Sequence, residues 1–582
     1  MSAPAFTAPP FTAPSRWLAV APLLCVALSA IYGWASVHPG MMPGRSASVL
    51  LLCGCIVVLA VPARMSWSWR SPQPWLVAAL VWQGIALAGW TVAREPGLLW
   101  WGERCAALLT ALGVCAWCQQ PDTHGRPRPI KQQLRALAGA GASCLILAAI
   151  TPPAVAELWP TGIDLPFGNP NFVVGGALPL LGLCLPFIFD QKKRDADWII
   201  IALCGLAAAV ILGTGLVSGD SCRAVWPGLA AMLGLAVILR LPARSHGWII
   251  GVGEAVVLVG FAGLIAGIIP TPDQSPSTGY RVEVWRSALE ASAQAPLVGT
   301  GPASSLIVLQ QQPHSPLAWL HVPSYAEHAH QEYLQAVLDG GLINAGLLLV
   351  AVLLMVTPLW RRRAEPASAA LLIAWAGVLT QAMIESHLSQ PGPLLLLALL
   401  AGVTWSHTDT AVKVGGIPWR VLCAIPIAAL MFAQISREFY DGGSPTMIEF
   451  RANKRIDAAK SDHLAAAAEA DGVRARLGDL ENWLTREAIS RAKAKEFDQA
   501  EILVRDQLNR LPLDPDALDL ALRLRDRHVA RGESSEAAEI DHTLHVAMTR
   551  AQAALAVVPA HAQTIELRAR LAELFQRIDH SR

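Results

Sequence analysis

Residues 341–360 read G-L-I-N-A-G-L-L-L-V-A-V-L-L-M-V-T-P-L-W, and none of these side chains carries a charge. About 20 mostly apolar residues are the length that a helix needs to cross the hydrocarbon core of a bilayer. The whole chain of 582 residues has the same character, because 53% of its residues are hydrophobic and only 15% are charged. This composition is typical of a membrane protein. We therefore predict an all-α polytopic membrane protein.

Thirteen segments of the chain have this apolar character, and two of them are short, so we predict about 12–13 transmembrane helices. The expected spans lie near 17–36, 46–63, 74–93, 98–118, 134–154, 171–189, 196–217, 225–240, 247–269, 341–360, 368–386, 392–406 and 417–436. Together they form one membrane domain, which we assign to residues 1–436.

The distribution of positive charge predicts how this domain is oriented. Alternate short loops, beginning after the second span, carry most of the basic residues: Arg64, Arg70, Arg126, Arg128, Lys131, Lys192, Lys193, Arg194, Arg240, Arg244, Arg361, Arg362, Arg363 and Lys413. The opposite short loops hold only Arg45, Arg94 and Arg223. Because cytoplasmic loops are enriched in Lys and Arg, the first set and the N-terminus should face the cytoplasm. Residues 271–340 and the chain after about 437 should then lie on the periplasmic side.

The C-terminal part, residues 440–582, changes character and becomes charged and Ala-rich. Two similar units, E-F-D-Q-A from Glu496 and E-S-S-E-A from Glu533, begin 37 residues apart, and each is followed by a Pro-containing segment. This pattern is typical of degenerate tetratricopeptide repeats, whose period is about 34 residues. A plain helical bundle is the alternative. In either case we predict a helical periplasmic domain that could bind a protein partner.

One large loop, residues 271–340, carries most of the polar chemistry. It contains T-G-Y-R-V-E-V-W-R (278–286), P-L-V-G-T-G-P (296–302) and H-A-H-Q-E-Y-L-Q (328–335). Ionisable residues at a membrane are expensive and commonly functional. We therefore predict that this periplasmic loop is the catalytic loop of the membrane domain.

Three arginines on the expected outer side, Arg223, Arg281 and Arg286, are candidates for binding phosphate. The guanidinium group is always charged, and its planar fork suits phosphate oxygens. An arginine cluster at the membrane surface therefore indicates a lipid-linked phosphate or diphosphate. The alternative is that these side chains snorkel or pair with neighbouring carboxylates, and for Arg286 that interpretation is favoured.

The segment from Tyr280 to Ala293 is expected to form an amphipathic helix. Helical spacing places Val282, Trp285, Leu289 and Ala293 on one face. Such a helix could lie flat on the membrane and present Arg281 to the plane of the lipid headgroups.

Four histidines, His314, His321, His328 and His330, fall within 17 residues of one another, which raises the question of zinc. A zinc site needs three or four ligands in fixed geometry, and the segment has neither a cysteine nor an H-E-x-x-H sequence. His328 and His330 would point to nearly opposite sides of a helix. We predict no metal site.

His330 is instead expected at the start of a helix at the membrane surface. In that helix His330, Tyr333, Leu334 and Val337 share a face, and Gly340-Gly341 closes the turn before the next span. A neutral imidazole, with a pKa near 6.5, can take a proton from a sugar hydroxyl. A capping or core histidine is the alternative interpretation.

Glu103 and Arg104 lie inside the fourth expected span, near its outer end. Charges at such depth usually line a cavity or pair with each other. The nearby sequence F-G-N-P-N-F (167–172) opens the sixth span, where Asn-Pro is a turn signal.

The order of these motifs resembles that of the O-antigen ligase and polymerase superfamily. The motifs are G-N-P-N (168–171), S-x-R (221–223), R-x-x-x-W (281–285), P-L-V-G-T-G (296–301) and H-Q-E-Y-L-Q (330–335). The family usually has H-N-x-Y-L-Q at the last position, so Gln331 replaces an Asn while the His is kept. The resemblance covers about residues 160–405, and the C-terminal repeats are similar to those that some members carry.

This resemblance implies a metal-independent, GT-C-like glycosyltransferase of the bacterial inner membrane that needs no cofactor. It implies a donor glycan on undecaprenyl diphosphate and an acceptor hydroxyl, that of lipid A–core, on the periplasmic face. Arg223 and Arg281 would bind the diphosphate and stabilise its departing charge. His330 would activate or orient the acceptor hydroxyl. Four weaker candidates for substrate binding are His328, Arg286, Glu103 and Arg104.

Other functions fit the same features. A repeat-unit polymerase would use another lipid-linked glycan as acceptor, and a protein O-oligosaccharyltransferase would use Ser or Thr. A transporter of lipid-linked sugars should carry charges at the bilayer midplane, whereas here they gather near the outer face. A membrane scaffold would act through the C-terminal repeats. The net charge of +1 predicts no nucleic-acid partner.

Overall fold

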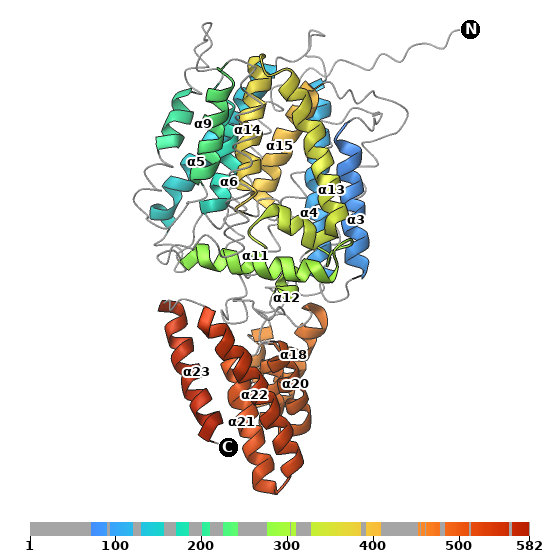
Figure 1. The fold of residues 1–582 in the computed structure, drawn as a ribbon, viewed down its shortest axis with the longest axis vertical. Coiled ribbons are helices and arrows are strands. Elements are labelled where there is room, and N and C mark those ends of the chain that lie inside the picture. The colour runs from blue at the N-terminus through green and yellow to red at the C-terminus, as the bar shows by residue number, and fades with distance from the viewer. Residues whose placement is uncertain are drawn as a thin grey trace, which may run out of the picture. The chain divides into compact units, whose positions relative to one another are not determined.

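The computed structural model describes the chain in segments that cover most of its apolar and C-terminal helices (Figure 1). The described residues are 71–89, 94–119, 130–155, 170–185, 201–209, 225–241, 276–302, 304–309, 328–385, 391–408, 452–453, 455–459, 461–477, 483–510, 514–557 and 562–580. All regular secondary structure in these segments is helical, which confirms the all-α prediction. The expected spans near 17–36, 46–63, 247–269 and 417–436 lie outside the described residues.

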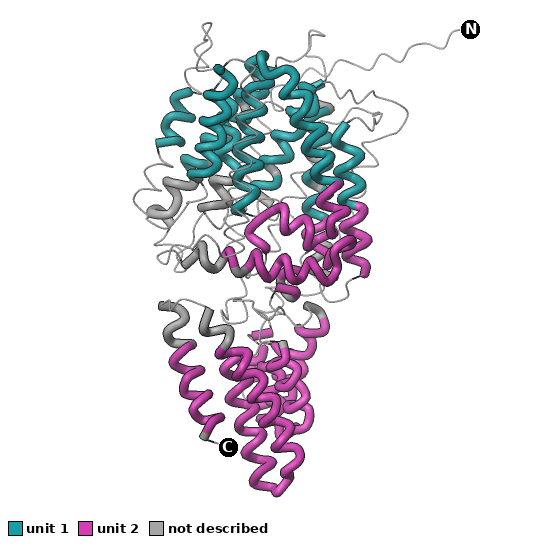
Figure 2. Tube along the Cα trace, viewed as in Figure 1, with its two compact units in different colours: residues 1–80, 102–249, 347–444 teal, residues 81–101, 250–346, 445–582 magenta. Residues whose placement is uncertain are grey.

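The chain divides into two compact units, which are coloured separately in Figure 2. Unit 1 comprises residues 1–80, 102–249 and 347–444. Unit 2 comprises residues 81–101, 250–346 and 445–582. The large loop 271–340 is therefore in the same unit as residues 81–101, which lie in the third and fourth expected spans, and as the C-terminal part of the chain.

Apolar helices occupy the other nine expected spans. They are α3 (Gln73–Gly89), α4 (Arg94–Gln119), α5 (Ile130–Val155), α6 (Pro170–Gly182), a helix over residues 201–209, α9 (Val225–Ile238), α13 (Glu332–Arg361), α14 (Pro366–Gln381) and α15 (Pro391–His407). α13 contains two helices that meet at Gly340-Gly341, so its first residue lies before the predicted span, whereas its second helix begins close to the predicted start.

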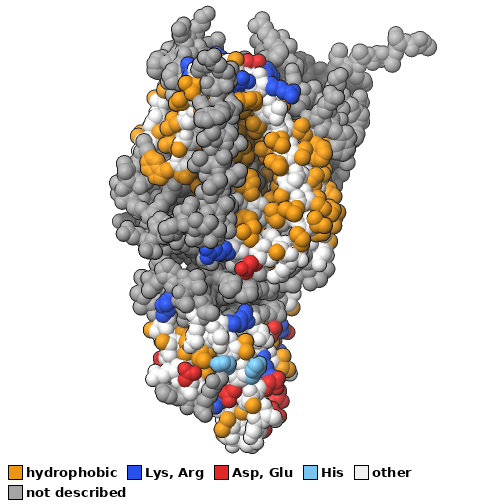
Figure 3. All heavy atoms as spheres, viewed as in Figure 1, with side chains coloured by type: hydrophobic (Ala, Val, Ile, Leu, Met, Phe, Trp, Pro, Cys, Tyr) orange, Lys and Arg blue, Asp and Glu red, His pale blue; other side chains and the backbone are white. Residues whose placement is uncertain are grey.

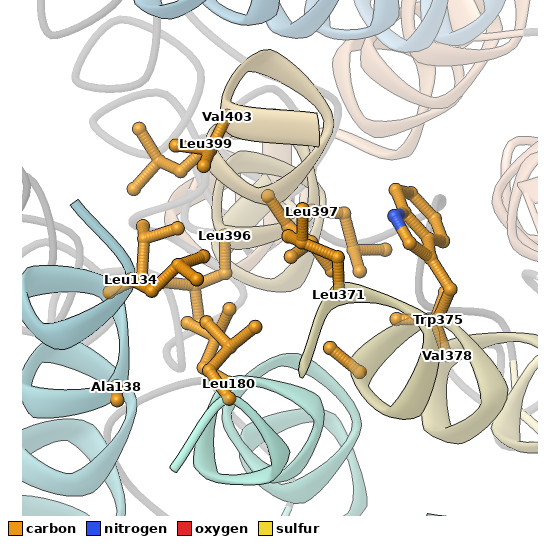
Figure 4. Packing of buried hydrophobic residues seen from close by; sticks show 14 of the residues in the cluster. Leu134, Ala138, Leu180, Leu371, Trp375, Val378, Leu396, Leu397, Leu399 and Val403 are labelled. Atoms are coloured by element: carbon orange, nitrogen blue, oxygen red, sulfur yellow. The ribbon is translucent and has the colours of Figure 1, made fainter. Parts of the chain in front are cut away.

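The core of unit 1 is built from leucines and small residues of four helices. Figure 4 shows Leu134 of α5, Leu180 of α6, Leu371 of α14 and Leu396 of α15 pointing toward one another. A Cβ at Gly141 would lie 2.6 Å from the Cβ of Leu180, so α5 and α6 approach too closely for a larger residue. Such close contact of small residues is the usual way in which helices associate inside a membrane.

The outer surface of α13 is apolar. Leu349 and Leu353 are 58% and 54% exposed, and hydrophobic side chains gather in this region in Figure 3. By length and composition, α13 is the one described helix that could cross a bilayer unaided, while shorter apolar helices run over 226–238, 366–381 and 396–407. Large exposed apolar surfaces mark contact with lipid or with another protein.

The C-terminal part of unit 2 consists of successive helices that pack on their neighbours. They are α18 (His463–Leu477), α19 (Trp483–Lys493), α20 (Phe497–Arg510), α21 (Pro515–Arg531), α22 (Ser534–Val557) and α23 (Ala562–His580). Glu496 directly precedes α20 and Glu533 directly precedes α22, so the two similar sequence units open equivalent helices. This placement agrees with tandem helix pairs, and their tetratricopeptide type remains a prediction.

Sequence chemistry explains where these helices begin and end. Asp514 caps α21, because its carboxylate accepts hydrogen bonds from the backbone amides of Asp516 and Ala517 at 3.0 and 3.1 Å. Pro515 occupies the first helical position, where no backbone donor is needed. Gly532 ends the helix with a φ of 74°, a left-handed conformation that glycine adopts without strain.

Candidate functional site

The candidate site begins where the P-L-V-G-T-G motif docks on α13, within unit 2. Gly299 has a φ of 75°, and a Cβ there would lie 2.4 Å from the backbone nitrogen of Gly341. Gly341 has a φ of 68°, and its Cβ would lie 2.2 Å from the carbonyl carbon of Leu297. The backbones therefore touch, and only glycine permits this contact. The glycines of the P-L-V-G-T-G motif therefore allow its backbone to pack directly against that of α13.

This contact coincides with a break in α13. Gly340 and Gly341 have non-helical backbone angles, so α13 is two helices joined end to end. The prediction that these glycines close a turn is confirmed. The carbonyl of Leu338, which loses its helical partner, accepts hydrogen bonds from both the backbone nitrogen and the Oγ1 of Thr300, at 2.6 and 3.1 Å.

The remaining polar groups at the break also have partners. The carbonyl of Gly340 accepts a hydrogen bond from the indole of Trp82 in α3 at 2.9 Å. Asn344, which is fully buried, donates to the carbonyl of Ala336 at 2.8 Å. A break in a buried helix is tolerated when neighbouring groups satisfy its backbone in this way. The start of α13 is therefore held rigidly against α3 and the docking motif.

Helix α11 (Pro276–Gln294) carries Arg281 and Arg286, both of them half-buried. The two residues lie five positions apart, so they project from different faces of the helix. In Figure 1 α11 runs crosswise to α3. Val282 and Trp285 are buried as predicted.

The prediction that Leu289 and Ala293 belong to the buried face is wrong. Leu289 is 41% exposed and Ala293 is exposed, whereas Ala288 and Ala291 are buried. One side of the helix packs against Leu309 of the following segment and against residues around the histidine motif. These partners bury Ala288 and Ala291, which were not on the predicted face. Leu289 is left outside that cluster.

The two described histidines of the loop occupy different environments. His328 is buried, and its ring centroid lies 4.7 Å from that of Trp100 in α4, with the rings tilted by 40°. His330 is half-buried and has a φ of 49°, an unusual left-handed conformation for a residue with a side chain. His314 and His321 lie outside the described residues. Among the residues that the structure describes, no three His, Cys, Asp or Glu side chains form a group that could hold a metal ion.

The predicted helix start needs a correction of two residues. The helix begins at Glu332, and Gln331 caps it, since its side-chain oxygen accepts the backbone N–H of Leu334. His330 therefore lies just before the helix and shares no helical face with Tyr333, which is 44% exposed. Asn is a preferred capping residue, so Gln331 can fill the capping role of the Asn that it replaces.

A chain of buried hydrogen bonds links the histidine segment to the helix. The backbone N–H of Ala329 donates to Oε1 of Gln335 at 2.8 Å, and Nε2 of Gln335 donates to Oδ1 of Asp339 at 2.7 Å. Gln335 and Asp339 are 0% and 1% exposed. In the sequence, Gln335 stood out only as the last residue of the H-Q-E-Y-L-Q motif, and Asp339 was not among the candidate site residues. Their spacing of four positions was the available signal, because it places them on one face of a helix.

The remaining candidates are distributed as follows. Arg281 directly precedes Val282, and His330 directly follows Ala329; Val282 and Ala329 belong to one buried cluster. Glu103 is buried and Arg104 half-buried, and both belong to unit 1. They follow Trp100 by three and four positions along α4, whereas Trp100 and His328 belong to unit 2. Arg223 lies outside the described residues, two positions before the first residue of α9.

Comparison with known families gives one match. A family model described as O-antigen ligase matches residues 207–351, which include Arg223, α11 and the break in α13. Glu103 and Arg104 lie before the matched residues. No curated protein matches the chain.

Proposed function

We propose that the chain belongs to the O-antigen ligase family, whose model matches residues 207–351, and that it is an integral membrane glycosyltransferase of lipopolysaccharide biosynthesis in the bacterial inner membrane. The glycan comes from undecaprenyl diphosphate, and the acceptor is a hydroxyl of lipid A–core on the periplasmic face. The observation that carries the proposal is the environment of His330. This residue immediately precedes the capping residue of a firmly held helix and follows Ala329, which packs in one buried cluster with residues of α11.

In the proposed reaction the imidazole of His330 accepts the proton of the acceptor hydroxyl. The oxygen attacks the anomeric carbon of the glycan, and the bond from that carbon to the diphosphate oxygen breaks. Undecaprenyl diphosphate leaves with the electron pair and with increased negative charge. Arg281 and Arg223 stabilise that charge through hydrogen bonds from their guanidinium groups.

We propose that no metal ion takes part. The donor already carries a good leaving group, so positioning and arginine charges are sufficient. Addition of EDTA should then leave the rate of transfer unchanged. A rate that EDTA abolishes and zinc restores would contradict this part of the proposal.

The weaker candidates have supporting roles in this scheme. His328, which is buried against Trp100, fixes the segment that carries His330. Arg286, Glu103 and Arg104 bind polar groups of the donor or acceptor. The C-terminal helices present a surface for a protein partner on the periplasmic side.

Mass analysis of the products tests the proposal. The full chain in lipid nanodiscs is given an undecaprenyl-diphosphate-linked oligosaccharide together with lipid A–core, with a Ser/Thr peptide, or with no added acceptor. We expect glycosylated lipid A–core from the wild type and none from His330→Ala. Glycan on the peptide would identify a protein O-oligosaccharyltransferase, and longer lipid-linked chains without acceptor would identify a polymerase. No product in any mixture, with donor binding confirmed, would favour a transporter or a scaffold.

A further inference from the structure

His330 is held in a backbone conformation that its own side chain disfavours. Its φ of 49° is left-handed, and non-glycine residues keep such a conformation only where the surrounding structure imposes it. The contacts that impose this backbone conformation must act on the two neighbouring residues, Ala329 and Gln331, because these set the direction of the chain on either side of His330.

Each neighbour is fixed to the first helix of α13. On the C-terminal side, the side chain of Gln331 caps the helix, and its carbonyl accepts the backbone N–H of Gln335 at 2.9 Å. On the N-terminal side, the backbone N–H of Ala329 donates to Oε1 of Gln335 at 2.8 Å. Gln335 therefore contacts both sides of His330, once through its backbone and once through its side chain.

Asp339 determines which way the Gln335 amide faces. The NH₂ group of Gln335 donates to the carboxylate of Asp339 at 2.7 Å. If the amide were turned over, its oxygen would face the carboxylate and its NH₂ group would face the N–H of Ala329, so both contacts would become repulsive. Both side chains are almost completely buried, and a misplaced amide could not recover its hydrogen bonds from water.

We propose that Gln335 and Asp339 are positioning residues that hold His330 in the left-handed conformation and thereby aim its imidazole at the acceptor hydroxyl. This inference rests on the proposed role of His330 as the base. Gln335 touches neither substrate in this account, because its polar atoms are already used within the protein.

The first test removes the side-chain hydrogen bonds. Gln335→Leu keeps a similar volume but cannot hold the N–H of Ala329. We expect kcat to fall by about a hundredfold, because a small misplacement of a catalytic group costs about that much, while KM for the undecaprenyl-diphosphate donor changes by less than about twofold. A rise in donor KM with unchanged kcat would overturn the positioning role.

The second test exchanges the amide and the carboxylate between positions 335 and 339, which should restore the hydrogen bonds. Gln335→Glu places a second carboxylate against Asp339 and should reduce kcat at neutral pH and above, where both groups tend to ionise. In Gln335→Glu/Asp339→Asn, the new amide can donate to the new carboxylate, which still accepts from Ala329. We expect the double variant to recover most of the wild-type kcat. A double variant that is as slow as Gln335→Glu, although folded, would overturn the proposal.

Asn344→Leu is the matched control for loss of a buried amide in α13. Asn344 is fully buried, donates to the carbonyl of Ala336 at 2.8 Å and accepts from Nε2 of Gln83 at 3.2 Å, so its hydrogen bonds are made at the break and not to Ala329 or Gln331. It should lower the melting temperature without the selective loss of kcat that is expected of Gln335→Leu. If both variants lose kcat in the same proportion to the fall in their melting temperatures, Gln335 has only a structural role.

The proposed function and the positioning role of Gln335 can be distinguished by experiment. Wild-type protein that transfers no glycan to any acceptor, with donor bound, would overturn the proposed function and the positioning role with it. Wild-type transfer that depends on His330 but is retained by Gln335→Leu would overturn the positioning role alone.

Discussion

The start of α13 and the C-terminal helices differ in how exposed many of their polar contacts are. Around the break in α13, polar side chains such as Gln335, Asp339 and Asn344 are buried and hydrogen-bonded to one another or to backbone groups. The C-terminal helices instead carry ion pairs on their surface, such as Arg577 with Asp519 at 2.9 Å. A buried polar group that loses its partner is expensive, whereas an exposed ion pair contributes little. Sensitivity to substitution should therefore concentrate near the histidine motif.

The largest expected effect comes from the contact of backbone with backbone at the break. Gly341→Ala forces a Cβ to 2.2 Å from the carbonyl carbon of Leu297 at a positive φ. We expect the free energy of unfolding to fall by at least about 3 kcal/mol and transfer to be lost. Thermal unfolding in nanodiscs measures the first effect.

Gly346→Ala is the control on the same helix, because nothing lies within 4 Å of a Cβ there. It should unfold at or slightly above the wild-type temperature, since alanine favours a helix more than glycine does. Equal destabilisation by the two substitutions would contradict the account of the break.

The second prediction concerns a helix cap in the C-terminal part that is buried like the polar groups of α13. Asp514 is fully buried, caps α21, and accepts a further hydrogen bond from Nε2 of Gln507 at 2.9 Å. Asp514→Ala should lower the free energy of unfolding by about 2 kcal/mol. Hydrogen exchange should then speed up most in the first turn of α21. Unchanged exchange there would show that the cap is dispensable.

The third prediction is a dependence of C-terminal stability on pH. Burial alone would lower the pKa of His528, but hydrogen bonds to Glu501 and Glu533, at 2.8 and 2.6 Å, outweigh it and raise the pKa above 6.5. The stabilisation is therefore complete below pH 6.5 and is lost as pH rises through the higher folded pKa. The expected change is on the order of 1 kcal/mol, because the burial of His528 opposes the gain from its two hydrogen bonds. Urea unfolding from pH 6 to pH 9 should show it in the wild type and not in His528→Gln.

The smallest effect belongs to the exposed ion pairs. Arg577→Gln removes the contact with Asp519, and both side chains are partly exposed. The free energy of unfolding should change by less than about 1 kcal/mol. A larger loss in chemical unfolding would remove the contrast between the two regions.

Much of the helical architecture could be predicted from the sequence. Expected spans near 134–154, 368–386 and 392–406 fall within a few residues of α5, α14 and α15, because long apolar runs with Pro or charged ends define their own limits. The contact between Gly299 and Gly341 could not be predicted in the same way. These residues lie 42 positions apart, and each glycine by itself indicates only a turn.

The details of the candidate site were also beyond the sequence. The buried face of α11 was misjudged because its partners come from the loop and from the start of α13. The left-handed conformation of His330 depends on a hydrogen bond between a backbone amide and a side chain six residues later. Periodicity identifies which residues share a helix face, but it does not identify which of them reaches back to the preceding segment.

The role of His330 as the base in glycan transfer can be tested directly. His330→Asn is the sharpest variant, because Asn tolerates the left-handed backbone and the fold should be retained. The measurement is the rate of single-turnover transfer from an undecaprenyl-diphosphate-linked glycan to the acceptor found in the product analysis. The melting temperature of the variant is first shown to equal that of the wild type. The account predicts a rate about a hundredfold or more below that of the wild type, with donor affinity unchanged. Transfer by His330→Asn at the wild-type rate would contradict it.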